Sequence, residues 1–332
     1  AELRGALFAS GARLALAPQA AACRDACRAA ARVAPGWSGC PGQEEHPIQS
    51  GFYANLREEL PAPSSGAVGG RPDRVFGPNV WPPGAAGASL REAVCAAGRA
   101  MWNAGLAALT LAEEVAEVEA LERGAPLGSG ALRLRQLVEE AFFQPTRLVY
   151  YDAACAREDS LLGGLHHLPW HVDFNAVTVL CPAVWLPEDS LLAGEANLED
   201  VLDGSESAAA ERGGGLLLRN ALGNVTPAAL PEDCVLVQLG AFTQIASGGL
   251  LRAGPHAVGP RGADSFSGAL GRMSFGLFCY VPWETAMQPP VGHPGTEEDV
   301  LSDDFGGLMR KAYTGEAVLA GFQRFAGFMN SL

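Results

Sequence analysis

The spacing of apolar residues along the sequence changes at Pro145. Before this residue, apolar side chains recur with helical spacing over long segments. After it, they gather in short runs separated by Gly, Pro, Asn and Asp. Helices followed by many short strands do not fit alternating βαβ units with a parallel sheet. The sequence therefore predicts a mainly β fold, an antiparallel sandwich or barrel with flanking helices.

The expected elements follow from this periodicity and from the turn residues between them. Ser89, with Glu92 three positions later, has the pattern of a helix N-cap. We expect helices at about 1–34, 89–123, 132–143 and 308–329, and a loop-rich stretch at 35–88. We expect strands at 147–151, 176–180, 215–219, 234–239 and 273–281.

Three regions follow from these elements. Residues 1–145 form an N-terminal helical and loop region that packs on the core, 146–285 form the β core, and 286–332 form a C-terminal extension with a helix. Within the core, residues 187–212 are rich in Asp and Glu and are expected to form an acidic insertion.

Composition narrows the class of protein and of partner. Hydrophobic residues make up 48% of the 332 residues, which is enough for a large core. A net charge of −14 argues against nucleic acid as a partner. The absence of an uninterrupted apolar run of membrane-spanning length predicts no membrane partner. Eight scattered cysteines favour a soluble protein in a reducing compartment, the cytoplasm or an organelle lumen. The oligomeric state is not indicated.

His171 and Asp173 are the first candidate ligands of a metal ion. Two positions apart in an extended segment, they lie on one side of the chain and can hold one ion. The pair is a weak signal alone, because roughly 0.7 such pairs are expected by chance in a chain with this many His and acidic residues. A third ligand is available at His256. Two histidines and one carboxylate form the facial triad of non-haem iron(II) sites, although zinc hydrolases use the same residue types.

Arg272 and Ser274 favour the oxygenase interpretation. They alternate on one strand face, where a guanidinium fork and a hydroxyl can receive the distal carboxylate of a dicarboxylic oxoacid. A hydrolase has no use for this second anchor.

Several segments together resemble one enzyme family. The segments are Phe76–Pro82, Arg147–Tyr151, His171–Thr178, Gly213–Arg219, Val235–Gly240, Gly248–His256 and Arg272–Ser274. Their motifs and order resemble the isopenicillin N synthase-like branch of the 2-oxoglutarate- and iron(II)-dependent oxygenases. This resemblance implies a double-stranded β-helix, or jelly-roll, core with an N-terminal helical region and a C-terminal helix.

The resemblance also implies an activity and a set of ligands. The implied reaction is hydroxylation or desaturation of a small organic substrate, using Fe(II), 2-oxoglutarate and O2 and releasing succinate and CO2. Tyr151 falls where family members place a tyrosine near the oxoacid, whereas Val149 replaces a family asparagine. Apart from the metal centre, no catalytic residue is predicted.

Residues beside the motifs are candidates for lesser roles. Trp170, Phe174 and Asn175 flank the metal ligands and are candidate substrate contacts. His166 and His167 precede the triad, and we expect such a pair in a Gly-Leu loop to face solvent. The aromatic side chains of the last strand, Phe278 and Tyr280, are expected to pack the sheet.

Two other functions stay open. One is an iron(II) oxidase of the same fold that does not use 2-oxoglutarate. The other is a non-catalytic structural or interaction protein with the oxygenase fold and the acidic insertion as its contact surface. The intact triad and Arg272 argue against the second alternative.

Overall fold

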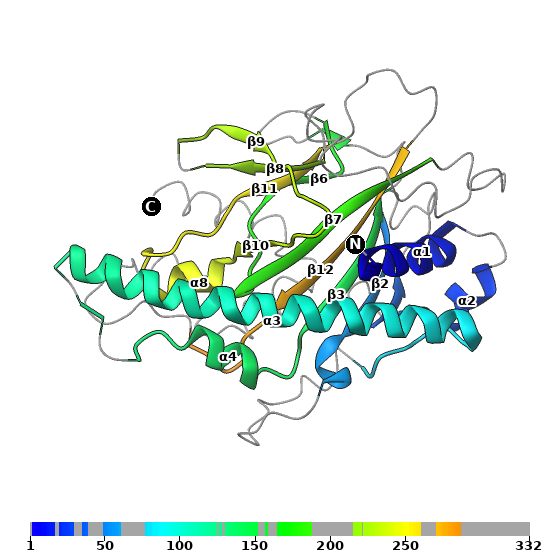
Figure 1. Ribbon diagram of the computed structural model, residues 1–332, viewed down its shortest axis with the longest axis horizontal. Helices are drawn as coiled ribbons and strands as arrows, with labels where there is room; N and C mark the ends of the chain where they lie inside the picture. The colour runs from blue at the N-terminus through cyan, green and yellow to red at the C-terminus, as the bar shows by residue number, and fades with distance from the viewer. Residues whose placement is uncertain are drawn as a thin grey trace.

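Two antiparallel sheets face each other, and helices cover the outer face of the larger one (Figure 1). The computed structural model describes residues 2–16, 20–29, 35–38, 49–60, 77–124, 126–127, 130–151, 157–158, 165–187, 215–220, 222–259 and 270–286. The acidic insertion, apart from the backbone of Pro187, and the expected helix at 308–329 lie outside these residues.

The larger sheet has six strands, and several strands that lie side by side in it are far apart in the sequence. In spatial order they are β1 (Gly36–Ser38), β2 (Gln49–Asn55), β3 (Pro145–Tyr151), β12 (Leu270–Cys279), β7 (Val177–Pro187) and β10 (Leu236–Leu239). The central strand β12 pairs with β3 on one side and β7 on the other, with Arg272 opposite Tyr151.

The smaller sheet has four short strands. In spatial order they are β6 (Leu168–His171), β11 (His256–Gly259), β8 (Gly215–Arg219) and β9 (Val225–Pro227). A separate pair is formed by β4 (Arg157–Glu158) and β5 (Leu165–His166). The smaller sheet therefore carries both predicted histidine ligands, one on each of two neighbouring strands.

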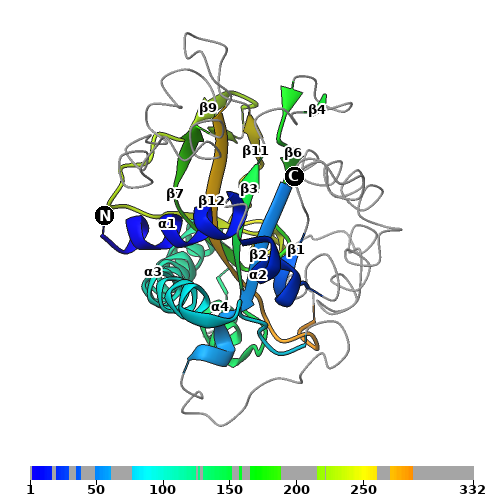
Figure 2. The same ribbon diagram turned by 90° about the vertical axis from the view of Figure 1, so that its right-hand side faces the viewer.

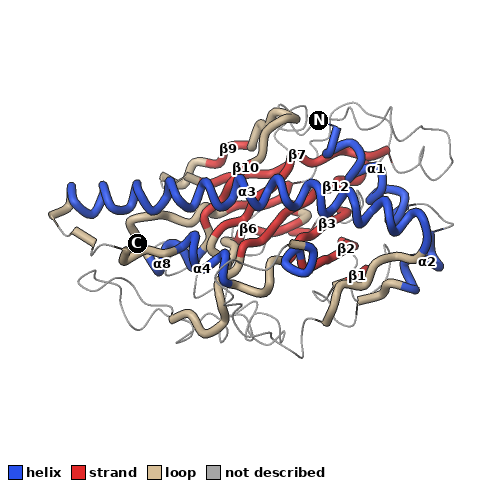
Figure 3. The backbone as a smooth tube through the Cα atoms, turned by 60° about the horizontal axis from the view of Figure 1, so that its bottom comes forward, coloured by secondary structure: helices blue, strands red, loops and turns tan. Residues whose placement is uncertain are grey.

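A long helix lies across the larger sheet (Figure 3). The helices are α1 (Glu2–Leu16), α2 (Ala21–Ala26), α3 (Gly84–Glu122), α4 (Leu134–Glu140) and α8 (Ala241–Ala246), with a 3-10 turn, η2 (Leu56–Glu59). Figure 2 shows α1, α3 and α4 on one side of the larger sheet. A side chain at Gly105 of α3 would contact Val179 of β7 at 3.0 Å, so this glycine lets the helix approach the sheet closely.

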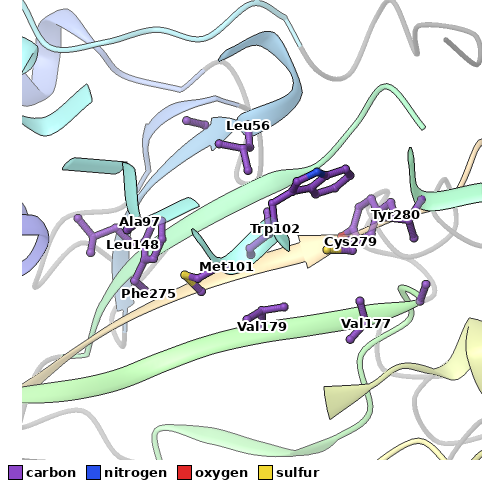
Figure 4. Close-up of a cluster of buried hydrophobic side chains, with 14 of the residues drawn as sticks. Leu56, Ala97, Met101, Trp102, Leu148, Val177, Val179, Phe275, Cys279 and Tyr280 are labelled. Carbon is purple, nitrogen blue, oxygen red and sulfur yellow. The ribbon is translucent and has the colours of Figure 1, made fainter. Parts of the chain in front are cut away.

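Strand alternation divides the apolar side chains between two cores. Met273, Phe275, Leu277 and Cys279 of β12 are buried in the larger core under the helices. In Figure 4, Met101 and Trp102 of α3 lie over the strands that carry Val179 and Cys279. The second core, between the two sheets, is formed by Val149, Tyr151, Leu216, Ala228, Leu230 and Val258. The opposite faces of β3, β7 and β12 are therefore free to line a site between the sheets.

Most of the expected elements are present in the structure, with shifted ends. Residues 35–38 and 49–60, expected to be loops, contain β1 and β2, which extend the larger sheet beyond β3. The long helix begins at Gly84 rather than Ser89, because Pro83 is the last residue with an extended backbone. Among the described residues, no helix is long and apolar enough to span a bilayer.

Candidate metal centre

His171, Asp173 and His256 come together between the two sheets. His171 ends β6 and His256 begins β11, and the two residues are directly paired in the antiparallel ladder. Their rings lie 4.1 Å apart between centroids. Asp173 follows two residues after His171, where the chain crosses from the smaller sheet to β7 of the larger one.

The ligand atoms of these three side chains converge. The Nε2 atom of His171 lies 3.7 Å from Oδ1 of Asp173, and the Nε2 atom of His256 lies 3.8 Å from Oδ2. One ligand atom from each residue lies within 4.8 Å of the other two. These separations are too long for hydrogen bonds and leave room for an ion between the three atoms. Two imidazole nitrogens and one carboxylate oxygen suit a first-row transition metal.

Neighbouring groups orient two of the three ligands. Nδ1 of His256 lies 3.1 Å from the carbonyl oxygen of Gly254. Because a carbonyl only accepts, Nδ1 carries the proton and the Nε2 lone pair faces the site. Thr178 Oγ1 donates to Oδ2 of Asp173 at 2.6 Å and accepts from Nδ2 of Asn175 at 2.9 Å. The carboxylate therefore has a fixed rotamer.

The charge state of Asp173 suits a metal ligand. Burial opposes its ionisation, but the electrostatic influence of the adjacent His256 and His171 side chains and the hydrogen bond from Thr178 together hold the pKa of Asp173 below its ordinary value. Asp173 is therefore ionised at neutral pH and presents a negative charge to a cation.

The short helix α8 fixes the backbone of the Asp173 loop. The N–H groups of Ala241 and Phe242 donate to the carbonyl oxygens of Asp173 and Phe174 at 2.7 and 3.2 Å. Gly240 lies so close to this loop that a Cβ atom there would be 1.9 Å from the carbonyl oxygen of Asn175. These backbone contacts hold the turn that presents the carboxylate.

A cavity between the sheets joins the three ligands to Arg272. Arg272, Ser274 and Tyr151 line it together with the triad. The guanidinium of Arg272 is buried and lies 5.8 Å from the ring centre of Tyr151. Burial raises the pKa of Tyr151, and the charge of Arg272 offsets this only in part, so the phenol stays protonated and can donate. The cavity therefore has a metal-ligand set and a buried cationic end with two hydroxyl groups.

The remainder of the cavity wall is largely apolar. Val149, which stands where the resembled family has asparagine, lies beside Ser274 on the adjacent strand. Other apolar lining residues are Leu168, Leu180, Ala183, Leu216, Leu230 and Val258. A largely apolar wall strengthens electrostatic interactions with the few polar groups.

The three candidate substrate contacts do not line this cavity. Trp170 lies under the guanidinium of Arg219 at 4.6 Å, Phe174 packs against the larger core, and Asn175 is fully buried beside Thr178. Their contribution to substrate binding stays a prediction. His167, expected to face solvent, is instead buried with its ring 5.8 Å from that of Tyr151, because it lies between the β5 and β6 strands.

Several cavity residues had no predicted role at the site, among them Thr178, Arg147 and Phe278. Thr178 ends the segment that resembles the family's metal-binding motif, Arg147 begins an expected strand, and Phe278 was expected to pack the sheet. Arg147, Val149 and Tyr151 alternate on one face of β3, and this alternation is the signal that could have identified Arg147 as a neighbour of Tyr151.

Known structures of one family share this architecture. The chain matches no family model, and no curated protein matches it in sequence. A full-length protein from Neurospora crassa, in complex with alpha-KG and 5-formyluracil, is 16% identical with a TM-score of 0.56, over 94% of this chain and 82% of that one.

Two further solved structures have a similar fold. A 2OG-Fe(II) oxygenase family protein from Caulobacter crescentus is 16% identical, with a TM-score of 0.54 over 94% of this chain and 86% of that one. The dioxygenase for auxin oxidation in rice is 18% identical, with a TM-score of 0.50 over 96% of this chain and 85% of that one. The chain therefore has the fold of the 2-oxoglutarate- and iron(II)-dependent oxygenases.

Proposed function

We propose that this chain is a 2-oxoglutarate- and iron(II)-dependent oxygenase that hydroxylates or desaturates a small organic substrate. The observation that carries the proposal is the convergence of His171, Asp173 and His256 on one cavity that also holds buried Arg272. A metal hydrolase would need the triad alone, whereas an oxoacid needs a cationic anchor as well. The fold shared with solved oxygenases supports the same conclusion.

The residues divide the work between the metal and the oxoacid. His171, Asp173 and His256 would hold iron(II) on one side and leave positions for other ligands. Arg272 would receive the distal carboxylate of 2-oxoglutarate in a bidentate contact, with hydroxyl donors from Ser274 and Tyr151 beside it. Bound iron(II), with 2-oxoglutarate and O2, supplies the oxidant that removes hydrogen from the substrate, with release of succinate and CO2.

The chain itself supplies geometry and a dry environment. Thr178 and the Gly254 carbonyl keep two ligands in one orientation before metal binds, which lowers the entropic cost of assembling the site. The apolar wall between the sheets keeps bulk water from the reacting groups. We further propose that the two sheets close into a double-stranded β-helix, as in the resembled family. The narrower likeness to the isopenicillin N synthase-like branch stays a prediction.

The test is an anaerobic titration of the iron(II)-loaded protein with 2-oxoglutarate. A weak visible charge-transfer band should grow with the oxoacid in wild type. It should be absent in Arg272→Ala, because the anchor is lost, and unchanged in Arg99→Ala, which removes an exposed arginine of α3. Circular dichroism of each variant verifies that it is folded.

The alternatives give different results in the same titration. An iron(II) oxidase without a need for 2-oxoglutarate would bind iron at the triad but give no oxoacid band. A non-catalytic protein would give no band and no stoichiometric iron binding. Either outcome in folded wild-type protein would refute the proposed co-substrate.

A further inference from the structure

The strand β7 contains a bulge beside the proposed oxoacid end of the cavity, which is the part lined by Arg272, Ser274 and Tyr151. Between two successive pairs of the ladder that joins β7 to β12, β12 has one residue, Ser274, whereas β7 has two, Pro182 and Ala183. The extra residue on β7 makes a β-bulge. Because side chains alternate along a strand, one extra residue exchanges the faces to which the following side chains of β7 point.

The bulge determines which side chains of β7 face the cavity. Before it, Thr178 and Leu180 line the cavity. From the bulge onward, Cys181 and Ala183 line it instead. The side chains of the other parity on each side of the bulge are buried in the larger core and are Val177, Val179, Val184 and Leu186. Without the bulge, the alternation set by Thr178 would place Pro182 in the cavity wall and turn Ala183 into the core.

Arg4 of the N-terminal helix α1 holds this bulge. Its Nε donates to the carbonyl oxygen of Pro182 at 2.9 Å, and its Nη2 donates to that of Ala183 at 3.0 Å. The side chain is 9% exposed, and its guanidinium carbon lies 5.6 Å from the ring centre of Phe8. A bulge takes backbone groups out of the regular ladder, and buried carbonyls without donors are costly. One guanidinium that donates to both carbonyls therefore stabilises the bulged form of the strand.

Ala183 forms a small part of the wall next to the proposed anchor. It lines the cavity together with Arg272 and Ser274. On β12, Ser274 lies opposite the bulge, and Arg272 lies two residues from Ser274 on the same strand face. A methyl group at this position leaves room for a carboxylate beside the guanidinium, whereas the ring of Pro182 would occupy more of that room. The bulge therefore determines how much space the oxoacid end contains.

We propose that Arg4 is a positioning residue for 2-oxoglutarate that acts through Ala183. By holding the bulge, its guanidinium keeps the small side chain in the wall of the oxoacid end and keeps Pro182 out of it. Among the described residues that line the cavity, none belongs to α1, so the helix affects the site only through β7. The inference rests on the proposed function for the identity of the ligand, whereas the hold of Arg4 on the bulge does not depend on it.

The test separates oxoacid affinity from metal affinity in Arg4→Met, which keeps the apolar stem and removes the donors. The affinity for 2-oxoglutarate, measured from the charge-transfer band of the anaerobic iron(II) protein, should fall about tenfold or more. The affinity of the apo protein for manganese(II) should stay near wild type, because Thr178 and α8 fix the Asp173 ligand independently of the bulge. Arg4→Lys retains N–H donors and should recover part of the oxoacid affinity.

Glu232 provides the matched control. Its Oε1 lies 3.7 Å from Nη1 of Arg4, and its side chain is 41% exposed. Glu232→Gln removes this exposed ion pair but leaves both hydrogen bonds from Arg4 to the bulge, so the affinity for 2-oxoglutarate should stay near wild type. An equal loss in Glu232→Gln and Arg4→Met would assign the effect to the charge of the pair and would contradict the role of the bulge.

A double-variant cycle tests whether Arg4 acts through Ala183. Ala183→Val enlarges the side chain in the wall and should weaken 2-oxoglutarate binding about tenfold or more without changing the manganese(II) affinity. If both substitutions act on the same wall, the loss in the combined variant should be smaller than the product of the two single losses. Hydrogen exchange of the backbone N–H groups of residues 183–186 in the apo proteins measures the bulge directly, and it should be faster in Arg4→Met than in wild type or Glu232→Gln.

Three results would overturn the inference while the proposed function stands. Arg4→Met could bind 2-oxoglutarate as tightly as wild type. It could lose manganese(II) and oxoacid affinity to the same extent, which would show a general loss of structure. The losses in the double-variant cycle could multiply, which would mean that Arg4 does not act through Ala183. An oxoacid band that is absent already in wild type would instead refute the proposed function and the role in oxoacid binding together, and the exchange rates would then report only on the bulge.

Discussion

Thr178 donates a 2.6 Å hydrogen bond to the Asp173 carboxylate and is itself fully buried. We predict that Thr178→Val, which keeps the volume but not the hydroxyl, weakens divalent metal binding by about tenfold to a hundredfold. The cause is loss of the group that fixes the carboxylate rotamer. Manganese(II) titration of the apo protein measures the affinity, and Thr178→Ser is the matched control that should stay near wild type. Equal affinity in Thr178→Val would show that the hydroxyl does not orient the ligand.

Residue types and spacing singled out His171, Asp173, His256 and Arg272, which the structure places around one cavity, but not the residues that surround them. His171, Asp173 and His256 are chemically distinctive, so the sequence could identify them, and the structure brings them together. Thr178 and Arg147 have common residue types, and their position at the site depends on the pairing of β3, β12 and β7 across long separations in sequence. Such long-range register is not visible in local patterns.

The contact between α8 and the Asp173 loop depends on a residue without a side chain. A Cβ atom at Gly240 would lie 1.9 Å from the carbonyl oxygen of Asn175, and backbone cannot move aside cheaply. We predict that Gly240→Ala lowers the free energy of unfolding by about 2 kcal/mol or more and weakens metal binding as well. Urea denaturation of the apo protein measures the first effect.

A second glycine provides the control for this substitution. Gly5 lies in α1 with nothing within 4 Å of an added Cβ, so Gly5→Ala should raise stability by about 0.5–1 kcal/mol through helix propensity. If Gly240→Ala proves as stable as wild type, the close approach of α8 to the Asp173 loop is not required.

Glu59 joins the 3-10 turn η2 to the start of α3. Its carboxylate accepts from Nε and Nη2 of Arg91 at 3.2 and 2.8 Å, and from Asn79 and Trp81 at 3.3 Å each. Burial opposes ionisation, but Arg91 and the other donors hold the pKa of Glu59 below its ordinary value. The folded chain therefore gains stability from ionised Glu59 at pH above the unfolded pKa, and loses it as pH falls through the folded pKa.

We predict that Glu59→Gln costs about 1 kcal/mol of unfolding free energy at neutral pH, and that the difference from wild type shrinks toward zero below about pH 4. Glu92→Gln, which neutralises an exposed carboxylate one position from Arg91 in sequence, should have little effect at either pH. Denaturation at several pH values compares the three proteins. A difference that is independent of pH would rule out the charge as its cause.

The periodic spacing of apolar residues predicted those helices and strands that each bury one continuous face. The helix at 89–123 and the strands at 147–151 and 215–219 have strong local patterns, and the structure contains all three. The strands β1 and β2 were missed because their stability comes from pairing, β1 with β2 and β2 with β3, rather than from their own composition. The helix α8 has six residues, which is too short for helical periodicity to identify.

The two sheets enclose the metal site, so ligand binding should stabilise the whole molecule. We predict that manganese(II) at about one hundred times its Kd adds about 2.7 kcal/mol to the free energy of unfolding and raises Tm by several degrees. Asp173→Ala should show no such shift, because it removes the negative ligand. Thermal denaturation with and without the ion tests this. A Tm rise of equal size in the variant would place the ion elsewhere.

The most direct test of the central claim is CO2 release from 2-oxoglutarate labelled at its first carbon, in the presence of iron(II) and O2. Wild type should form labelled CO2 and succinate in equal amounts, and only when iron(II) and O2 are both present. Asp173→Ala should form neither above the protein-free rate. No labelled CO2 from folded, iron-loaded wild type, or the same yield from Asp173→Ala, would contradict the assignment of this chain as a 2-oxoglutarate-dependent oxygenase.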